Sequence, residues 1–66
     1  MPEKWTGALV GKMHNYRITQ EMLADKLGVR KPYVSMILNG KRKPPNIRKR
    51  MEDALNELIA EQRSEP

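Results

Sequence analysis

The chain has 66 residues, no cysteine, one histidine and a formal net charge of +5. This length leaves room for one domain, which we expect to span residues 1–66. The lack of cysteine excludes a disulfide scaffold and thiolate metal sites, and no apolar run approaches the ~20 residues of a membrane span. We therefore expect a soluble protein without a metal, a cofactor or a membrane contact.

The charge is distributed unevenly along the sequence. Residues 26–51 contain nine basic residues and no acidic one, whereas residues 52–66 contain five acidic residues and one basic residue, Arg63. A basic segment of this kind suits a polyanion such as a nucleic acid. The alternative is that the basic residues only solvate a small domain, and composition does not choose between the two.

The first predicted helix begins near Pro2 and Glu3, because proline and an acidic residue both suit a first turn. An apolar stripe at helical spacing follows at Trp5, Leu9, Met13 and Tyr16. Gly7 and Gly11 weaken this helix by roughly 1 kcal/mol each relative to alanine. Because the two glycines lie one turn apart, we hypothesise that they admit another backbone at close range.

The next predicted helix is short and covers residues 20–27. Thr19 is a good N-cap residue, since its hydroxyl can accept from an otherwise unpaired N–H. Met22 stands three positions later, so no capping box is expected. Gly28 ends the helix, because glycine enters the left-handed conformation at little cost.

A second short helix is predicted over residues 31–39. Pro32 lies in its first turn, where proline does little harm, and Asn39 with Gly40 ends it. Its buried face is expected to consist of Val34, Ile37 and Leu38.

After a basic, proline-containing loop, a longer helix is predicted over residues 46–62, capped by Asn46 and followed by frayed residues 64–66. Its apolar residues are Ile47, Met51, Ala54, Leu55, Leu58 and Ile59. They form a stripe about 140° wide, whereas a core-facing stripe needs about 100°. Leu55 and Ile59 lie at one edge, so they either form a dimer interface or are covered by the first helix. The predicted fold is a compact, all-α arrangement of four helices.

Two short helices around a glycine turn form the helix-turn-helix pattern. The pattern needs a small residue where the helices cross, which Ala24 supplies, and a glycine at the corner, which is Gly28. The segment ITQEMLADKLGVRKPYVSMILNGKRKP, residues 18–44, resembles the Cro, lambda-repressor and xenobiotic-response-element group of bacterial and phage regulators. This resemblance implies that residues 31–39 lie in the major groove of DNA while residues 20–27 cross the backbone.

The exposed side of the second short helix mixes hydrogen-bonding and apolar groups, as readout of base edges requires. Base contacts are expected from Lys31, Pro32, Ser35 and Met36. Contacts with the DNA backbone are expected from Gln20, Arg30, Tyr33, Asn39, Lys41, Arg42 and Lys43. The role of Gln20 is implied by the resemblance. Arg30 departs from the family pattern, which usually has a serine or threonine cap there.

The sequence therefore predicts double-stranded DNA binding, and the resemblance implies a small cytoplasmic transcriptional repressor of the phage or mobile-element type. A homodimer is expected, formed either in solution or only on operator DNA, and no small-molecule ligand is evident. The alternative is a protein-interaction module, antitoxin-like or an adaptor, built on the same fold. An enzyme is not expected, because no nucleophile has an adjacent base and no phosphate-binding loop is present.

Overall fold

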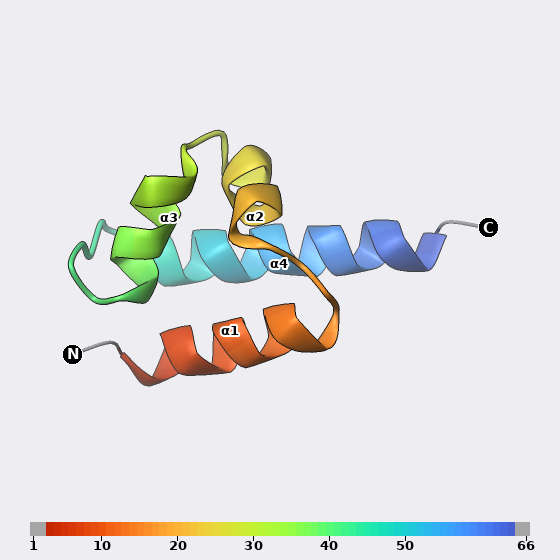
Figure 1. The fold of residues 1–66 in the computed structure, drawn as a ribbon, viewed down its shortest axis with the longest axis horizontal. Coiled ribbons are helices and arrows are strands. Elements are labelled where there is room, and N and C mark those ends of the chain that lie inside the picture. The colour runs from red at the N-terminus through yellow and green to blue at the C-terminus, as the bar shows by residue number, and fades with distance from the viewer. Residues whose placement is uncertain (1–2, 65–66) are drawn as a thin grey trace.

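The computed structural model describes residues 3–64, and these residues form four α-helices (Figure 1). The helices are α1 (Lys4–Asn15), α2 (Gln20–Leu27), α3 (Lys31–Leu38) and α4 (Ile47–Ser64). α1 runs alongside α4, and α2 packs against both α3 and α4. The predicted all-α class, with two short helices in succession over residues 20–39, is confirmed.

α1 begins at Lys4, and Glu3, which the sequence predicts for the first turn, is extended and precedes the helix. The Glu3 carbonyl accepts hydrogen bonds from the Thr6 amide at 3.1 Å and from the Thr6 hydroxyl at 2.6 Å. These bonds satisfy the buried Thr6 side chain, which sequence reasoning did not place in the core. Pro2 lies outside the described residues.

The hypothesis that Gly7 and Gly11 admit a second backbone is wrong. Both glycines are exposed, and a β-carbon added at either would meet no atom within 4 Å. α1 contacts its neighbours through the opposite side, where Leu9 and Met13 are buried. The glycines therefore face solvent.

The start of α2 confirms Thr19 as the N-cap residue and corrects the prediction about the capping box. The Thr19 hydroxyl accepts from the Met22 amide at 3.1 Å. The Met22 sulfur accepts in turn from the Thr19 amide at 3.5 Å, which closes the reciprocal box. Sequence reasoning missed this bond because a thioether is only a weak acceptor and the usual partner is glutamate or glutamine.

The turn between α2 and α3 has the backbone that the sequence predicts. Gly28 adopts a left-handed conformation with φ 75°, and the Val29 amide returns to the Ala24 carbonyl at 3.0 Å. Arg30 occupies the N-cap position of α3 and makes no side-chain capping bond. α3 ends at Leu38, one residue earlier than predicted, and Gly40 follows with φ 77°.

α4 begins at Ile47, and the predicted role of Asn46 needs correction. Asn46 has φ 60°, which is left-handed rather than the extended conformation of a side-chain N-cap. Its backbone carbonyl accepts from the Arg50 amide at 3.1 Å. The helix continues beyond the predicted end at residue 62 and includes Ser64, the first of the residues 64–66 expected to fray, while residues 65–66 lie outside the described part of the chain.

The core is one cluster to which all four helices contribute. Its largest fully buried side chains are Leu23, Val34, Ile37, Met51 and Leu55. Of the two alternatives for Leu55 and Ile59, an uncovered edge or one covered within the chain, the structure shows the second, since they are only 1% and 7% exposed. α4 is covered from two sides, by α1 and by α2, so a stripe wider than 100° is still buried. Leu58, which also belongs to the predicted apolar stripe, is only partly buried.

Candidate nucleic-acid interface

The exposed side of α3 carries the residues that the sequence predicts for base contacts. Val34, Ile37 and Leu38 are buried, which confirms the inward face of this helix. Lys31 and Pro32 are exposed on its first turn, and Ser35 is half-buried. Met36 is 41% exposed, an unusual fraction for a large apolar side chain in this chain. The exposed face of α3 therefore presents two apolar side chains, Pro32 and Met36, among polar ones.

Two further contacts order the polar groups of this face. The Asn39 amide nitrogen donates to the Ser35 hydroxyl at 3.4 Å, one turn along the helix. The Lys31 ammonium lies 3.9 Å from a carboxylate oxygen of Glu21 on α2. Sequence reasoning did not assign Glu21 to this site, although its position in the first turn of the preceding helix could have indicated that it lies near α3.

A basic cluster lies at the N-terminal end of α3. Gln20, Glu21 and Lys31 line one shallow hollow together with Thr19. A second hollow is lined by Arg30, Glu21 and Lys31, among others. Two residues predicted to contact the DNA backbone, Gln20 and Arg30, are thus brought next to Lys31 at the same end of the helix.

The other end of α3 leads into the basic loop, which we define as Lys41, Arg42 and Lys43. All three side chains are exposed. The Lys41 amide donates to the Met36 carbonyl at 2.9 Å, so the loop is bonded directly to the last turn of α3. The Arg42 guanidinium lies 5.9 Å from the centre of the Tyr33 ring, a cation–π distance. Tyr33 therefore orients Arg42.

Lys43 of the basic loop contacts the N-terminal end of α1. Its ammonium lies 3.4 Å from the Oε1 atom of Glu3. The Trp5 indole N–H donates to the other carboxylate oxygen, Oε2, at 2.5 Å. The Trp5 hydrogen bond, together with Lys43, holds the pKa of the Glu3 carboxyl below its ordinary value. Sequence reasoning assigned neither Glu3 nor Trp5 to this site, because the two segments are 40 residues apart.

The remaining cations of the basic segment are largely paired with the acidic residues of α4. Arg48 lies 3.3 Å from Glu52, and Lys49 lies 3.0 Å from Asp53, each one helical turn away. Lys26 on α2 pairs with Glu61, which raises the pKa of Lys26 above its ordinary value. Lys31 and Lys43 near α3 also have carboxylate neighbours, but these lie on α2 and at the start of α1 rather than on α4.

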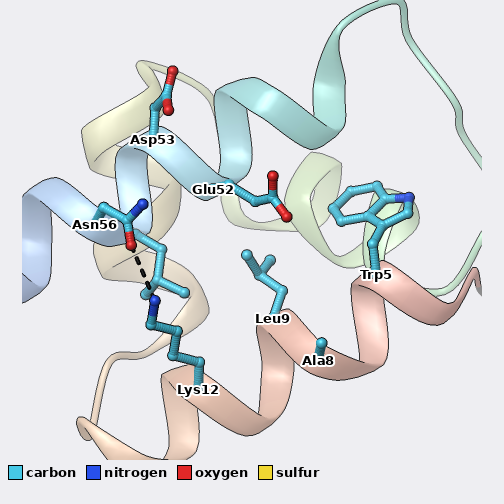
Figure 2. Close-up of a pocket in the computed structure, with 8 residues that line it drawn as sticks. Trp5, Ala8, Leu9, Lys12, Glu52, Asp53 and Asn56 are labelled. Carbon is cyan, nitrogen blue, oxygen red and sulfur yellow. Dashed lines mark hydrogen bonds between the residues drawn. The ribbon is translucent and has the colours of Figure 1, made fainter.

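A separate cavity lies between α1 and α4 (Figure 2). Its volume is about 250 Å³, and the Lys12 ammonium donates across it to the Asn56 side-chain oxygen at 3.1 Å. It is lined by Trp5, Ala8, Leu9, Lys12, Glu52, Asp53, Leu55 and Asn56. None of the predicted DNA contacts lines this cavity.

Two other kinds of site are absent from the described residues 3–64. No group of three or more histidine, cysteine or carboxylate side chains there could hold a metal ion. No helix within that range is both long and apolar enough to cross a membrane.

Comparison with known proteins gives one match. A family model described as helix-turn-helix matches residues 15–57, which include α2, α3, the basic loop and the first part of α4. Nearly all of α1 lies outside this match. Among curated proteins and among solved structures, no match to the chain was found.

Proposed function

Because the chain belongs to the helix-turn-helix family of the Cro and lambda-repressor type, whose members bind double-stranded DNA, we propose that it reads a specific DNA sequence as a small transcriptional repressor of the phage or mobile-element type. The observation that carries this proposal is the arrangement around α3. Its exposed face holds Lys31, Ser35 and Met36, and basic residues stand at both ends of the helix.

The dimensions of α3 suit the major groove. An α-helix with its side chains is about 10–12 Å across, which fits a groove about 12 Å wide, and the eight residues of α3 extend about 12 Å along their axis. In this position Lys31 donates to the O6 and N7 atoms of guanine, and Met36 meets the methyl group of thymine. Ser35 serves as donor or acceptor, and Pro32 provides an apolar contact beside it.

Cations at both ends of α3 then face the phosphates on either side of the groove. At the N-terminal end of α3, Gln20 and Arg30 contact the phosphates of one DNA strand. At its C-terminal end, the basic loop contacts the other strand together with Tyr33 and Asn39. Contacts of this kind fix the register of the protein on the duplex but carry no sequence information themselves.

A second copy on the other half of a two-fold operator is part of the proposal, since one helix-turn-helix unit reads only a few base pairs. The burial of Leu55 and Ile59 speaks against these two residues as the dimer contact.

Selection of bound sequences from a random duplex pool tests the proposed function. We expect a defined motif with two-fold symmetry, which Lys31→Ala and Met36→Ala alter. Affinity for the best sequence should fall steeply with salt. Six to ten phosphate contacts over two half-sites correspond to a loss of about 10³–10⁵ between 50 and 200 mM. Failure to bind any duplex at low salt would contradict the proposal and favour a protein-binding module.

A further inference from the structure

The Glu3 carboxylate joins two parts of the molecule that are far apart in sequence. One oxygen contacts the Lys43 ammonium and the other accepts from the Trp5 indole, so both oxygens are engaged. Beneath this contact a hollow of about 30 Å³ is lined by Trp5, Thr6, Ile37 and Ile47, among others. The contact thus connects the start of α1 with the basic loop at the end of α3.

The pair lies at the surface. The Glu3 and Lys43 side chains are 46% and 62% exposed, respectively. Exposed ion pairs contribute little to stability, so a competing anion can separate them without unfolding the protein. The anion that the proposed function brings to Lys43 is a DNA phosphate. Lys43 cannot contribute its full charge to that phosphate while the Glu3 carboxylate remains beside it.

We propose that Glu3 is an internal competitor of DNA phosphate for Lys43, and that it thereby lowers both the affinity for DNA and its dependence on salt. This inference rests on the proposed function. A lysine that is already neutralised by a carboxylate replaces fewer counterions on the duplex, so it adds less than a full increment to the salt dependence.

Glu3→Gln is the informative substitution, because glutamine keeps an oxygen that accepts from the Trp5 indole while it removes the charge. We expect this variant to bind the selected duplex about two- to five-fold more tightly at low salt. A change of this size corresponds to the free energy that an exposed ion pair contributes. The slope of log affinity against log salt should steepen by up to about 0.9, the contribution of one phosphate contact.

The same substitution in a Lys43→Ala background tests whether the effect passes through Lys43. There, Glu3→Gln should leave affinity and slope nearly unchanged. Glu57→Gln is the matched control, because it changes the net charge equally but lies on α4, 3.9 Å from Lys26. It should alter binding less than Glu3→Gln does. Circular dichroism checks that each variant is folded.

Trp5 provides a second measurement, because it is the single tryptophan of the chain. Its indole N–H resonance reports the bond to Glu3, so it should shift when Lys43→Ala removes the other partner of the carboxylate in the free protein. An unchanged resonance would contradict the contact itself, whether or not DNA is bound.

The outcomes separate the inference from the proposed function. Weaker binding of Glu3→Gln would overturn the inference, because Glu3 would then support the loop in its DNA-binding position. An equal gain in both Lys43 backgrounds would also overturn it. If the wild-type chain binds duplex and Glu3→Gln binds identically, the inference alone fails. If the wild-type chain binds no duplex, both fail.

Discussion

Three glycines show how single positions contribute to stability in opposite ways. Gly7 and Gly11 lie within α1, where glycine loses more backbone entropy on folding than alanine does. No neighbouring atom occupies the space that a β-carbon would fill at either position. Gly28 has equally open surroundings, but its φ of 75° strains any residue with a β-carbon. Whether a β-carbon is tolerated at these three positions therefore depends on the backbone conformation rather than on the space around it.

We predict that Gly7→Ala and Gly11→Ala each raise the free energy of unfolding by about 1 kcal/mol. Gly28→Ala should lower it by about 1–2 kcal/mol, the cost of the left-handed conformation. Urea denaturation followed by circular dichroism measures all three. Loss of stability in either α1 variant would mean that the glycine meets a neighbour after all.

Glu3 makes stability depend on pH in a definite direction. Its pKa is lowered in the folded protein by the Trp5 hydrogen bond and by the positive charges of Lys43 and Arg48. The ionised carboxylate therefore stabilises the fold above its unfolded pKa, near 4.5, and this contribution is lost as the pH falls through the lower, folded value.

The stability of the wild-type chain relative to Glu3→Gln should accordingly be greatest above the unfolded pKa, near 4.5, and should be lost as the pH falls through the lower, folded pKa. Denaturation of both proteins over that range gives this difference and cancels the other carboxylates. In a Lys43→Ala background the pH dependence of the difference should be smaller. A difference that stays constant with pH would contradict the assigned ion pair.

At the scale of elements, the residues proposed for base contacts and those proposed for backbone contacts occupy different parts of the region around α3. Its exposed side chains lie along the helix, whereas the cations lie at its two ends and in the basic loop. Readout of bases depends on hydrogen bonds and methyl contacts, and attraction to phosphates depends only on charge. Substitutions in the two groups should therefore have different consequences for sequence preference.

We predict that Lys31→Ala and Met36→Ala each cost about 1–3 kcal/mol on the selected sequence and relax the preference at one or two positions. Lys43→Ala should weaken binding to all sequences about equally. Val10→Ala on α1 is a suitable control, because Val10 is 45% exposed and lies on another helix. Competition assays with single-base variants of the duplex measure these effects. An unchanged preference in both α3 variants would refute the assignment of α3 as the reading helix.

At the scale of the whole molecule, the fold brings the two halves of the charge pattern together. Lys26, Arg48 and Lys49 belong to the basic segment and pair with carboxylates of α4. Folding therefore places the carboxylates of α4 beside one part of the basic segment, whereas Lys31 and Lys43 near α3 meet Glu21 and Glu3 instead. The total charge predicts attraction to a polyanion, but the ion pairs decide where that attraction is strongest.

The burial of Ile59 leads to a prediction about assembly. Ile59→Glu places a charge in a site that is 7% exposed. The loss should reach at least the roughly 2–5 kcal/mol that truncation of a buried isoleucine costs, with the desolvation of a carboxylate in addition. In a chain of this size that is a large share of the total stability.

We therefore expect Ile59→Glu to unfold the chain rather than to dissociate a folded dimer. Val10→Glu, at an exposed position, should leave the fold intact. Circular dichroism and sedimentation of both variants distinguish unfolding from dissociation. If the Ile59→Glu variant is folded and its association is altered, the result would instead support the edge of α4 as a dimer interface.

Local sequence was sufficient to predict most of the fold. Thr19, Gly28 and Gly40 mark helix boundaries through interactions within a few residues, so their roles could be read without knowledge of the tertiary structure. The inward face of α3 followed from helical spacing for the same reason. Local signals were less reliable at the start of α4, where Asn46 has a left-handed backbone instead of the expected capping conformation.

Long-range packing decided the remaining features. Leu55 and Ile59 are buried because α1 and α2 cover α4 from two sides, and the width of an apolar stripe does not reveal how many neighbours a helix has. Glu3 meets Lys43 because α1 returns to the end of α3, a contact that no spacing in the sequence encodes. The sequence by itself determined the helices, their inward faces and the positive charge around α3, since these depend on neighbouring residues. Only the tertiary structure decided which surfaces stay exposed and which cations already have a partner, because both depend on contacts between distant segments.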